Sequence, residues 1–191
     1  MLDQALAGGH EVVALARHPE KLGSRPVLTV VEGNVLEPEM VTQTVRGADA
    51  VCCVLGNTPD NPEMVVSLGT ANVIAAMKVH DVRRLVVVSS LGIGDSRDQL
   101  PLAFRLVFKA VPGMRMAMAD KEAQEKLVRE SGLDWVIVRP GGLIDGPRTG
   151  KYTHGLEKKI VAGRIARADV ADFVLRQTAD DAYLRRAVAV T

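Results

Sequence analysis

Short apolar runs that alternate with segments of helical period constrain the fold of this 191-residue chain more than any other feature. Such short, continuous runs suit strands buried on both faces, and helices between them imply right-handed crossovers into a parallel sheet. The runs are Val12–Ala16, Val27–Val31, Ala50–Leu55, Leu85–Val88, Trp135–Val138 and Ala187–Val190.

Segments of helical period lie between these runs, at Pro38–Arg46, Pro62–Val79, Met114–Glu130 and around Asp169–Gln177. Alternating strands and helices predict an α/β fold with a doubly wound, Rossmann-like parallel sheet. We expect one domain over residues 1–191. After Arg139 the pattern loosens into turn signals, and we expect residues 140–191 to form the substrate side of that domain.

The amino end predicts an incomplete version of this fold. Leu2–Ala7 is too short for a stable helix by itself and stops at Gly8-Gly9. In a doubly wound domain a buried strand and a glycine-rich phosphate loop come before such a helix, so we expect both to be absent from this chain. Two explanations stay open: a start assigned too late, or a truly short chain that needs a partner strand or binds cofactor weakly.

Charge and cysteine content argue against several classes of protein. Lys+Arg 24 against Asp+Glu 23 leaves a net charge of +1, which gives no reason to expect nucleic acid or an anionic membrane as partner. Adjacent Cys52 and Cys53 suit neither a disulfide framework nor a zinc site, so we interpret them as small core residues and expect no metal. The chain shows no signal peptide or membrane span, which favours a reducing cytoplasm; the oligomeric state stays open.

A series of short motifs runs in order along nearly the whole chain. The motifs are Gly9–Leu22, Gly33–Val35, Asp49–Val51, Leu55–Asn57, Ala71–Lys78, Val88–Ser90, Arg129–Leu133, Val138–Pro140, Asp145–Thr153 and Arg167–Ala171. This series resembles the atypical short-chain dehydrogenases/reductases with an NAD(P)H-binding fold, and within them the biliverdin reductase B and flavin reductase group. The resemblance implies a nicotinamide cofactor and a small conjugated substrate such as a flavin, tetrapyrrole or quinone.

The adenosine end of the cofactor is expected at the turns after the first two apolar runs. Arg17 follows the Val12–Ala16 strand, with Lys21 one turn further on, and two cations there suit a ribose 2′-phosphate. NADP(H) is therefore favoured over NAD, although a solvated basic turn is the alternative. The resemblance places Asn34 and Val35 at the adenine edge, where Asn34 stands in place of the usual Asp and can both donate and accept.

The rest of the cofactor is expected over the carboxyl ends of the later strands. Leu55, Gly56 and Asn57 end one strand, where a glycine permits close approach to the ribose and pyrophosphate; a simple turn is the alternative. Ser89 ends the next strand, and Pro140 would fix the turn that abuts the nicotinamide ring.

Two residues are candidates for catalysis. Ser90 lies where short-chain reductases hold a catalytic hydroxyl, and Lys121 takes the place of the lysine in their Tyr-x-x-x-Lys pair. The tyrosine position of that pair is Ala117, so the usual proton donor is missing. A solvent proton can suffice when hydride passes to an electron-poor conjugated acceptor. An exposed ion pair between Lys121 and Glu125 is the alternative interpretation of the lysine.

These residues predict an NADPH-dependent reductase of a flavin or a related conjugated small molecule. A non-catalytic NADP(H)-sensing or protein-binding module on the same fold is the alternative, and a nucleotide-sugar or isomerising enzyme is weakened by the lost tyrosine. Arg148, Tyr152 and His154 could meet an anionic substrate or be surface residues. Asp169 is expected to cap the helix that follows it.

Overall fold

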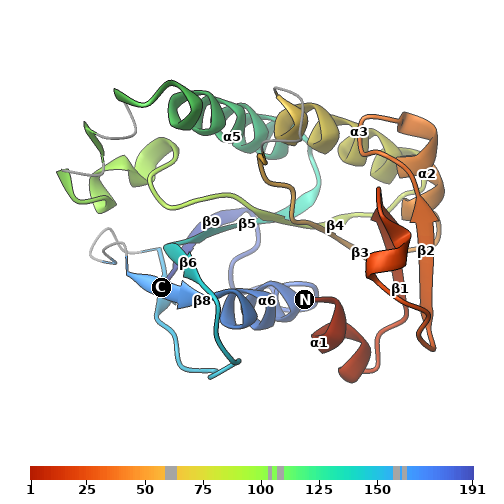
Figure 1. Ribbon diagram of the computed structural model, residues 1–191. Helices are drawn as coiled ribbons and strands as arrows, with labels where there is room; N and C mark the ends of the chain where they lie inside the picture. The colour runs from red at the N-terminus through yellow and green to blue at the C-terminus, as the bar shows by residue number, and fades with distance from the viewer. Residues whose placement is uncertain (59–63, 103–104, 107–109, 157–159, 161–162) are drawn as a thin grey trace.

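The computed structural model describes residues 1–191 except 59–63, 103–104, 107–109, 157–159 and 161–162. The described chain has three layers, with the strands between two sets of helices (Figure 1). One face is covered by α2 (Pro38–Val45), α3 (Val65–Val79) and α5 (Pro112–Glu130). The other is covered by α1 (Leu2–Ala7) and α6 (Arg167–Arg176). Helices on both faces confirm the doubly wound, Rossmann-like α/β fold.

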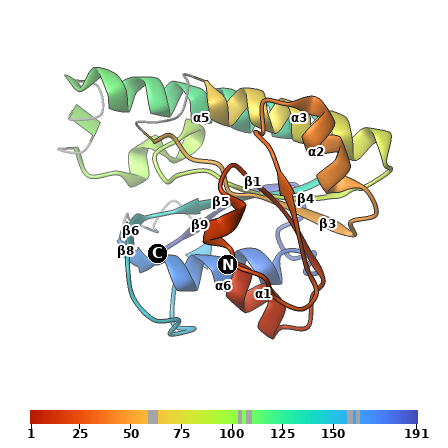
Figure 2. The ribbon, with the colours of Figure 1, turned by 45° about the vertical axis from the view of Figure 1, so that its right-hand side comes forward.

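The two helices of the second face, α1 and α6, lie side by side beneath the strands (Figure 2). The side-chain amide of Gln4 donates to the carbonyl oxygen of Ala168 at 2.9 Å and ties the short first helix to α6. This contact gives α1 the tertiary support that a helix of six residues needs.

The parallel strands form two separate ladders. β1 (Val12–Ala16) pairs with β2 (Leu28–Glu32). The larger ladder runs in the order β3 (Ala50–Cys53), β4 (Arg84–Val88), β5 (Asp134–Pro140) and β9 (Arg186–Val190), with β7 (His154–Gly155) antiparallel at its edge. Within the described strands no ladder joins β1 to β3. The break lies where the doubly wound order would place its first strand.

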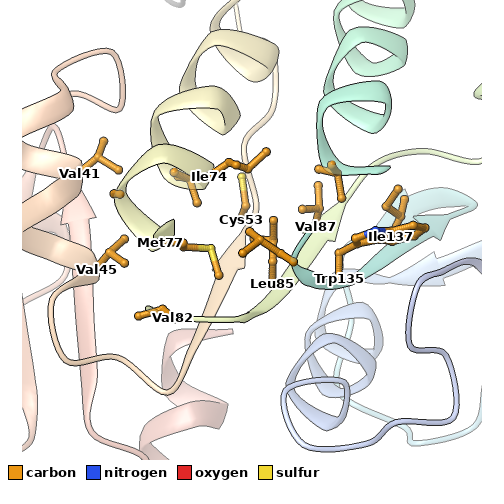
Figure 3. Packing of buried hydrophobic residues seen from close by; sticks show 14 residues of the cluster. Val41, Val45, Cys53, Ile74, Met77, Val82, Leu85, Val87, Trp135 and Ile137 are labelled. Atoms are coloured by element: carbon orange, nitrogen blue, oxygen red, sulfur yellow. The ribbon is translucent and has the colours of Figure 1, made fainter. Parts of the chain in front are cut away.

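The apolar runs form strands because both of their faces are covered. On the α3 and α5 side, Leu85, Val87 and Ile137 pack with Met77 and Trp135 (Figure 3). On the α6 side, the alternate residues Val86, Val136 and Val138 pack with Phe173 and Val188. The two clusters show why these runs are continuously apolar rather than alternating.

The remaining elements are short and belong mostly to the C-terminal part. β6 (Gly142–Ile144) and β8 (Arg164–Ala166) form a parallel pair, and 3₁₀ turns occupy Pro19–Lys21 and Gly94–Gln99. The expected helix start at Pro62 lies outside the described residues. All other predicted strands and long helices are present within a few residues of their expected ends.

The cysteines are core residues in the structure. Burial raises the pKa of the Cys52 thiol to about 12, and it also raises the pKa of Cys53. Both thiols are therefore protonated at neutral pH, which argues against a redox role. In the described ranges no group of three or more His, Cys, Asp or Glu side chains could hold a metal ion. No described helix is long and apolar enough to cross a membrane.

Candidate functional site

The predicted binding residues follow the carboxyl ends of parallel strands, so they gather along one edge of the strand layer. Two backbone hydrogen bonds connect neighbouring ends: Gly33 N–H donates to Ala16 O at 3.1 Å, and Leu91 N–H to Pro140 O at 3.0 Å. Open α/β sheets bind ligands in the crevice at this edge. The strand topology thus brings the candidate residues to one edge of the strand layer.

The basic turn after β1 is exposed. Arg17 and Lys21 both face solvent, and within the described chain neither side chain has an ion-pair partner. His18 lies 3.4 Å from Glu20 and is therefore occupied by a local pair. Two unpaired cations at this place suit a phosphate ligand, as the sequence predicts for Arg17 and Lys21.

The turn after β2 is fixed by the side chain of Asn34 and by Asn72, which the sequence did not single out as a site residue. The Asn34 side-chain oxygen accepts from Leu36 N–H at 3.0 Å, so it is used within the turn. The side-chain amide of Asn72 on α3 donates to Val35 O at 2.9 Å. The turn therefore uses one of the two lone pairs of the Asn34 oxygen, and the dual donor and acceptor role expected for Asn34 stays a prediction.

Helix α3 brings the ends of β2 and β3 together through a glycine. A Cβ atom built on Gly69 would lie 2.7 Å from Val35 Cγ1 and 2.9 Å from Leu55 Cδ1. Both predicted cofactor-binding residues therefore pack directly onto the helix backbone at this point. A side chain at Gly69 would displace them, and no signal in the sequence distinguished this glycine from other helical residues.

Lys121 bridges the carboxyl ends of β3 and β4. Its half-buried Nζ donates to Val88 O at 3.0 Å and to Leu55 O at 3.3 Å. Burial lowers the pKa of the Lys121 ammonium below its ordinary value, and interactions with Cys53, Asp120 and Glu125 oppose this shift. The exposed Lys121–Glu125 ion pair considered from the sequence is wrong, because Glu125 has another partner.

That partner is Arg139, the last residue before Pro140. Its Nε donates to Glu125 Oε1 at 2.9 Å and one terminal NH₂ to Oε2 at 2.6 Å. Both side chains are 4% exposed. The same guanidinium lies 2.7 Å from Asp95 in the turn after β4. This network, which sequence reasoning missed, holds β5, α5 and the β4 turn in one arrangement; a charged residue ending the apolar run Trp135–Val138 was its only signal.

Asp120, the neighbour of Lys121, caps α3 from another helix. Its carboxylate is 1% exposed and accepts from Val66 N–H at 3.0 Å, Ser67 N–H at 2.8 Å and Asn57 Nδ2 at 3.2 Å. The predicted cofactor residue Asn57 is thus oriented by Asp120. The sequence did not indicate this role, since the contacting residues are more than fifty positions apart.

The two serines after β4 differ in their surroundings. Ser89 is buried, and its hydroxyl has no hydrogen-bond partner in the described structure. Ser90 is half-buried and donates to Leu91 O at 3.1 Å. A buried hydroxyl without a partner at a ligand-binding edge fits a polar group of a bound molecule. Gly56 adds room there, since no atom lies within 4 Å of the position that a Cβ would take. These residues fit a nicotinamide dinucleotide.

The polar loop of the C-terminal part is anchored to α6 on the other face of the strands. Asp172 accepts from Tyr152 Oη at 2.7 Å and pairs with Arg148 at 2.7 Å, while His154 Nδ1 lies 2.8 Å from Tyr183 Oη. These contacts show internal roles for Arg148, Tyr152 and His154. Both tyrosines of the chain lie in this cluster, on the opposite side from Lys121.

Asp169 holds the same loop rather than its own helix. Its carboxylate accepts from Thr149 N–H at 2.7 Å, Gly150 N–H at 2.8 Å and Thr149 Oγ1 at 2.8 Å. The N-cap of α6 is Ala166, so the prediction that Asp169 caps the helix is wrong. The physical reason is its position in the first turn, from which the side chain reaches the loop amides.

Comparisons with known proteins identify the family. The NAD(P)H-binding family matches residues 1–181. An uncharacterised chloroplast protein of Arabidopsis thaliana is 30% identical over 182 residues, covering 90% of this chain and 64% of the relative, so the chain spans less than two thirds of that protein. YhfK of Bacillus subtilis, described as an uncharacterised sugar epimerase, is 30% identical over 176 residues, covering 87% of this chain and 75% of the relative.

A solved structure extends the comparison to the fold. ChuY, an anaerobilin reductase from Escherichia coli O157:H7, is 28% identical and superimposes with a TM-score of 0.80, covering 99% of this chain and 88% of ChuY. The family match and the fold agree. The chain therefore belongs to the NAD(P)H-binding family.

Proposed function

We propose that this chain is a reductase that uses NADPH to reduce a flavin or a related conjugated small molecule. One observation carries the proposal. Lys121 lies at the crevice, and Ala117 stands one turn before it, at the position of the usual tyrosine. Both tyrosines of the chain instead form hydrogen bonds on the opposite face of the strands. Chemistry that needs a tyrosine, such as alcohol oxidation or epimerisation, is disfavoured by this arrangement. Reduction of a conjugated acceptor does not need one.

The residues at the crevice have separate roles in this proposal. NADPH supplies the hydride when it is bound. Arg17 and Lys21 attract the 2′-phosphate, and Asn34 and Val35 face the adenine. Leu55, Gly56 and Asn57 approach the ribose and pyrophosphate. Ser89 donates its unpartnered hydroxyl to the cofactor. Pro140 packs against the nicotinamide ring. Ser90 orients the acceptor.

Similarity to ChuY supports a reductase function, because that protein is described as an anaerobilin reductase. We also propose that the chain belongs to the biliverdin reductase B and flavin reductase group, is located in the cytoplasm and has a small molecule as its partner. The direct test is oxidation of NADPH by the purified chain with FMN, FAD, biliverdin or a quinone as acceptor. Turnover with one of these supports the proposal. Tight NADPH binding with no turnover of any acceptor would instead support a sensing module.

Charge reversal at Arg17 tests the expected choice of cofactor. Arg17→Glu removes a charge-assisted hydrogen bond to the 2′-phosphate and adds repulsion, so the preference for NADPH over NADH should fall by about 30-fold. The measurement is kcat/KM for both cofactors. Arg46→Glu is the matched control, because Arg46 is exposed after α2 and away from the crevice. An unchanged preference in the Arg17 variant would remove Arg17 from the cofactor site.

A further inference from the structure

Lys121 Nζ has one bonding direction that no described protein group takes. The nitrogen is tetrahedral: one bond goes to its own side chain, and two directions are taken by the carbonyl oxygens of Val88 and Leu55. The described structure shows no further hydrogen bond to this atom. The fourth direction therefore carries an N–H when the group is charged and a lone pair when it is neutral.

Both carbonyls come from the carboxyl ends of neighbouring strands, β3 and β4. They hold Nζ at the strand ends, and Val88 is followed by Ser89, whose buried hydroxyl has no partner among the described residues. An ammonium has three N–H groups and a neutral amine still has two, so either form can donate hydrogen bonds to both carbonyl oxygens. The two contacts therefore survive loss of the third proton, so the nitrogen stays in place while it titrates.

The crevice offers few other acids. Tyr152 and Tyr183 are engaged by Asp172 and His154 on the other face. His80 Nε2 lies 3.1 Å from Thr42 O behind α2. Serine hydroxyls are weak acids, and Glu125 is occupied by its buried ion pair with Arg139. Burial lowers the pKa of Lys121, and the groups that act against this shift are Asp120 and Glu125 on its own helix and Cys53 on β3. A buried lysine is a usable acid near neutral pH.

We propose that Lys121 is the proton donor of the reduction and replaces the absent tyrosine. The proposal rests on the reductase function proposed above. Acceptor, hydride and proton combine to give the reduced product. The Nζ–H bond breaks, its electron pair stays on nitrogen, and a new N–H or O–H bond forms on the acceptor. Two electrons arrive with the hydride supplied by NADPH. The neutral amine then takes a proton from water.

The kinetic test separates proton donation from holding the strands. Lys121→Ala should lower kcat by about 100-fold with little change in KM for NADPH. Added methylammonium should restore part of the rate, whereas tetramethylammonium, which has no N–H, should not. Lys121→Arg can still donate to the two carbonyls but does not release a proton, so it should stay as slow as the alanine variant. Lys126→Met, on an exposed part of α5, is the matched control and should keep full activity.

A second measurement needs no cofactor. NMR of the protein with ¹³C-labelled lysine should show Lys121 titrating below the ordinary value of about 10.4. An ordinary pKa for Lys121, a fully active Lys121→Arg variant, or equal recovery with both ammonium ions would overturn proton donation while leaving the reductase function intact. Absence of NADPH oxidation by the unmodified chain with every acceptor would overturn both proposals.

Discussion

Replacing Arg139 by methionine is expected to lower the free energy of unfolding by about 3 kcal/mol, because the buried carboxylate of Glu125 loses its bidentate partner and keeps only the longer contact, 3.3 Å, to the more exposed Arg129. The pair is bidentate, and each side chain is 4% exposed. Few single changes in a domain have a larger effect. Urea unfolding followed by the fluorescence of Trp135, the only tryptophan and a neighbour on β5, would measure it.

Two further variants isolate the cause. Arg185→Met removes an exposed ion pair with Asp134 and should change stability by no more than about 0.5 kcal/mol. The double variant Arg139→Met, Glu125→Leu removes both charges and should recover much of the loss, since apolar residues often replace a buried pair at little cost. If Arg139→Met were as stable as the unmodified chain, the network would not hold β5, α5 and the β4 turn together.

Asp120→Ala should lower the free energy of unfolding by about 3 kcal/mol. The buried amides of Val66 and Ser67 would lose their acceptor, and each unpaired buried donor costs about 1–3 kcal/mol. Asn57 would also lose its partner at the crevice. Asp98→Ala is a suitable control, because Asp98 is exposed and its one ion pair within the described ranges is a surface pair with Arg105.

The contribution of Asp120 should depend on pH in a defined direction. Burial alone would raise the pKa of this carboxyl, but hydrogen bonds from Ser67, Val66 and Asn57 outweigh it and lower the pKa. A carboxyl with a depressed folded-state pKa stabilises the protein above its unfolded value of about 3.9 and loses that effect as pH falls through the folded value. The stability difference between the unmodified chain and Asp120→Ala should therefore be constant from pH 7 to about pH 5 and shrink below about pH 4. A difference that grew on acidification would contradict this assignment.

The strands and long helices could be predicted because their residues report burial directly. Runs such as Leu85–Val88 and Trp135–Val138 are apolar on both faces, and both faces are covered. The short pair β6 and β8 could not be predicted, because three residues carry no periodicity. Their pairing depends on how the chain returns after β5, which is a tertiary property.

The candidate site could be predicted only in part, for a similar reason. Strand ends are visible in the sequence, so Arg17, Ser89 and Pro140 could be placed at one edge. The hydrogen-bond and ion-pair partners that other helices and strands supply could not be predicted from the sequence. Glu125 lies one turn after Lys121 and suggested an ion pair, but Arg139 competes for it with a bidentate, buried geometry. The sequence could not predict that Asp120 caps α3, because the helix that it caps is more than fifty residues away along the chain.

The most direct test of the proposed crevice is an NMR titration of the ¹⁵N-labelled chain with NADPH. Amide shifts are predicted along the carboxyl edge of the strands, at Arg17, Asn34, Gly56, Ser89 and Ser90, with further shifts at Lys121 and at Gly141 beside Pro140. Shifts confined to the α6 face and to the loop Asp145–Thr153, or no shifts at millimolar NADPH, would contradict the assignment of this edge as the cofactor site.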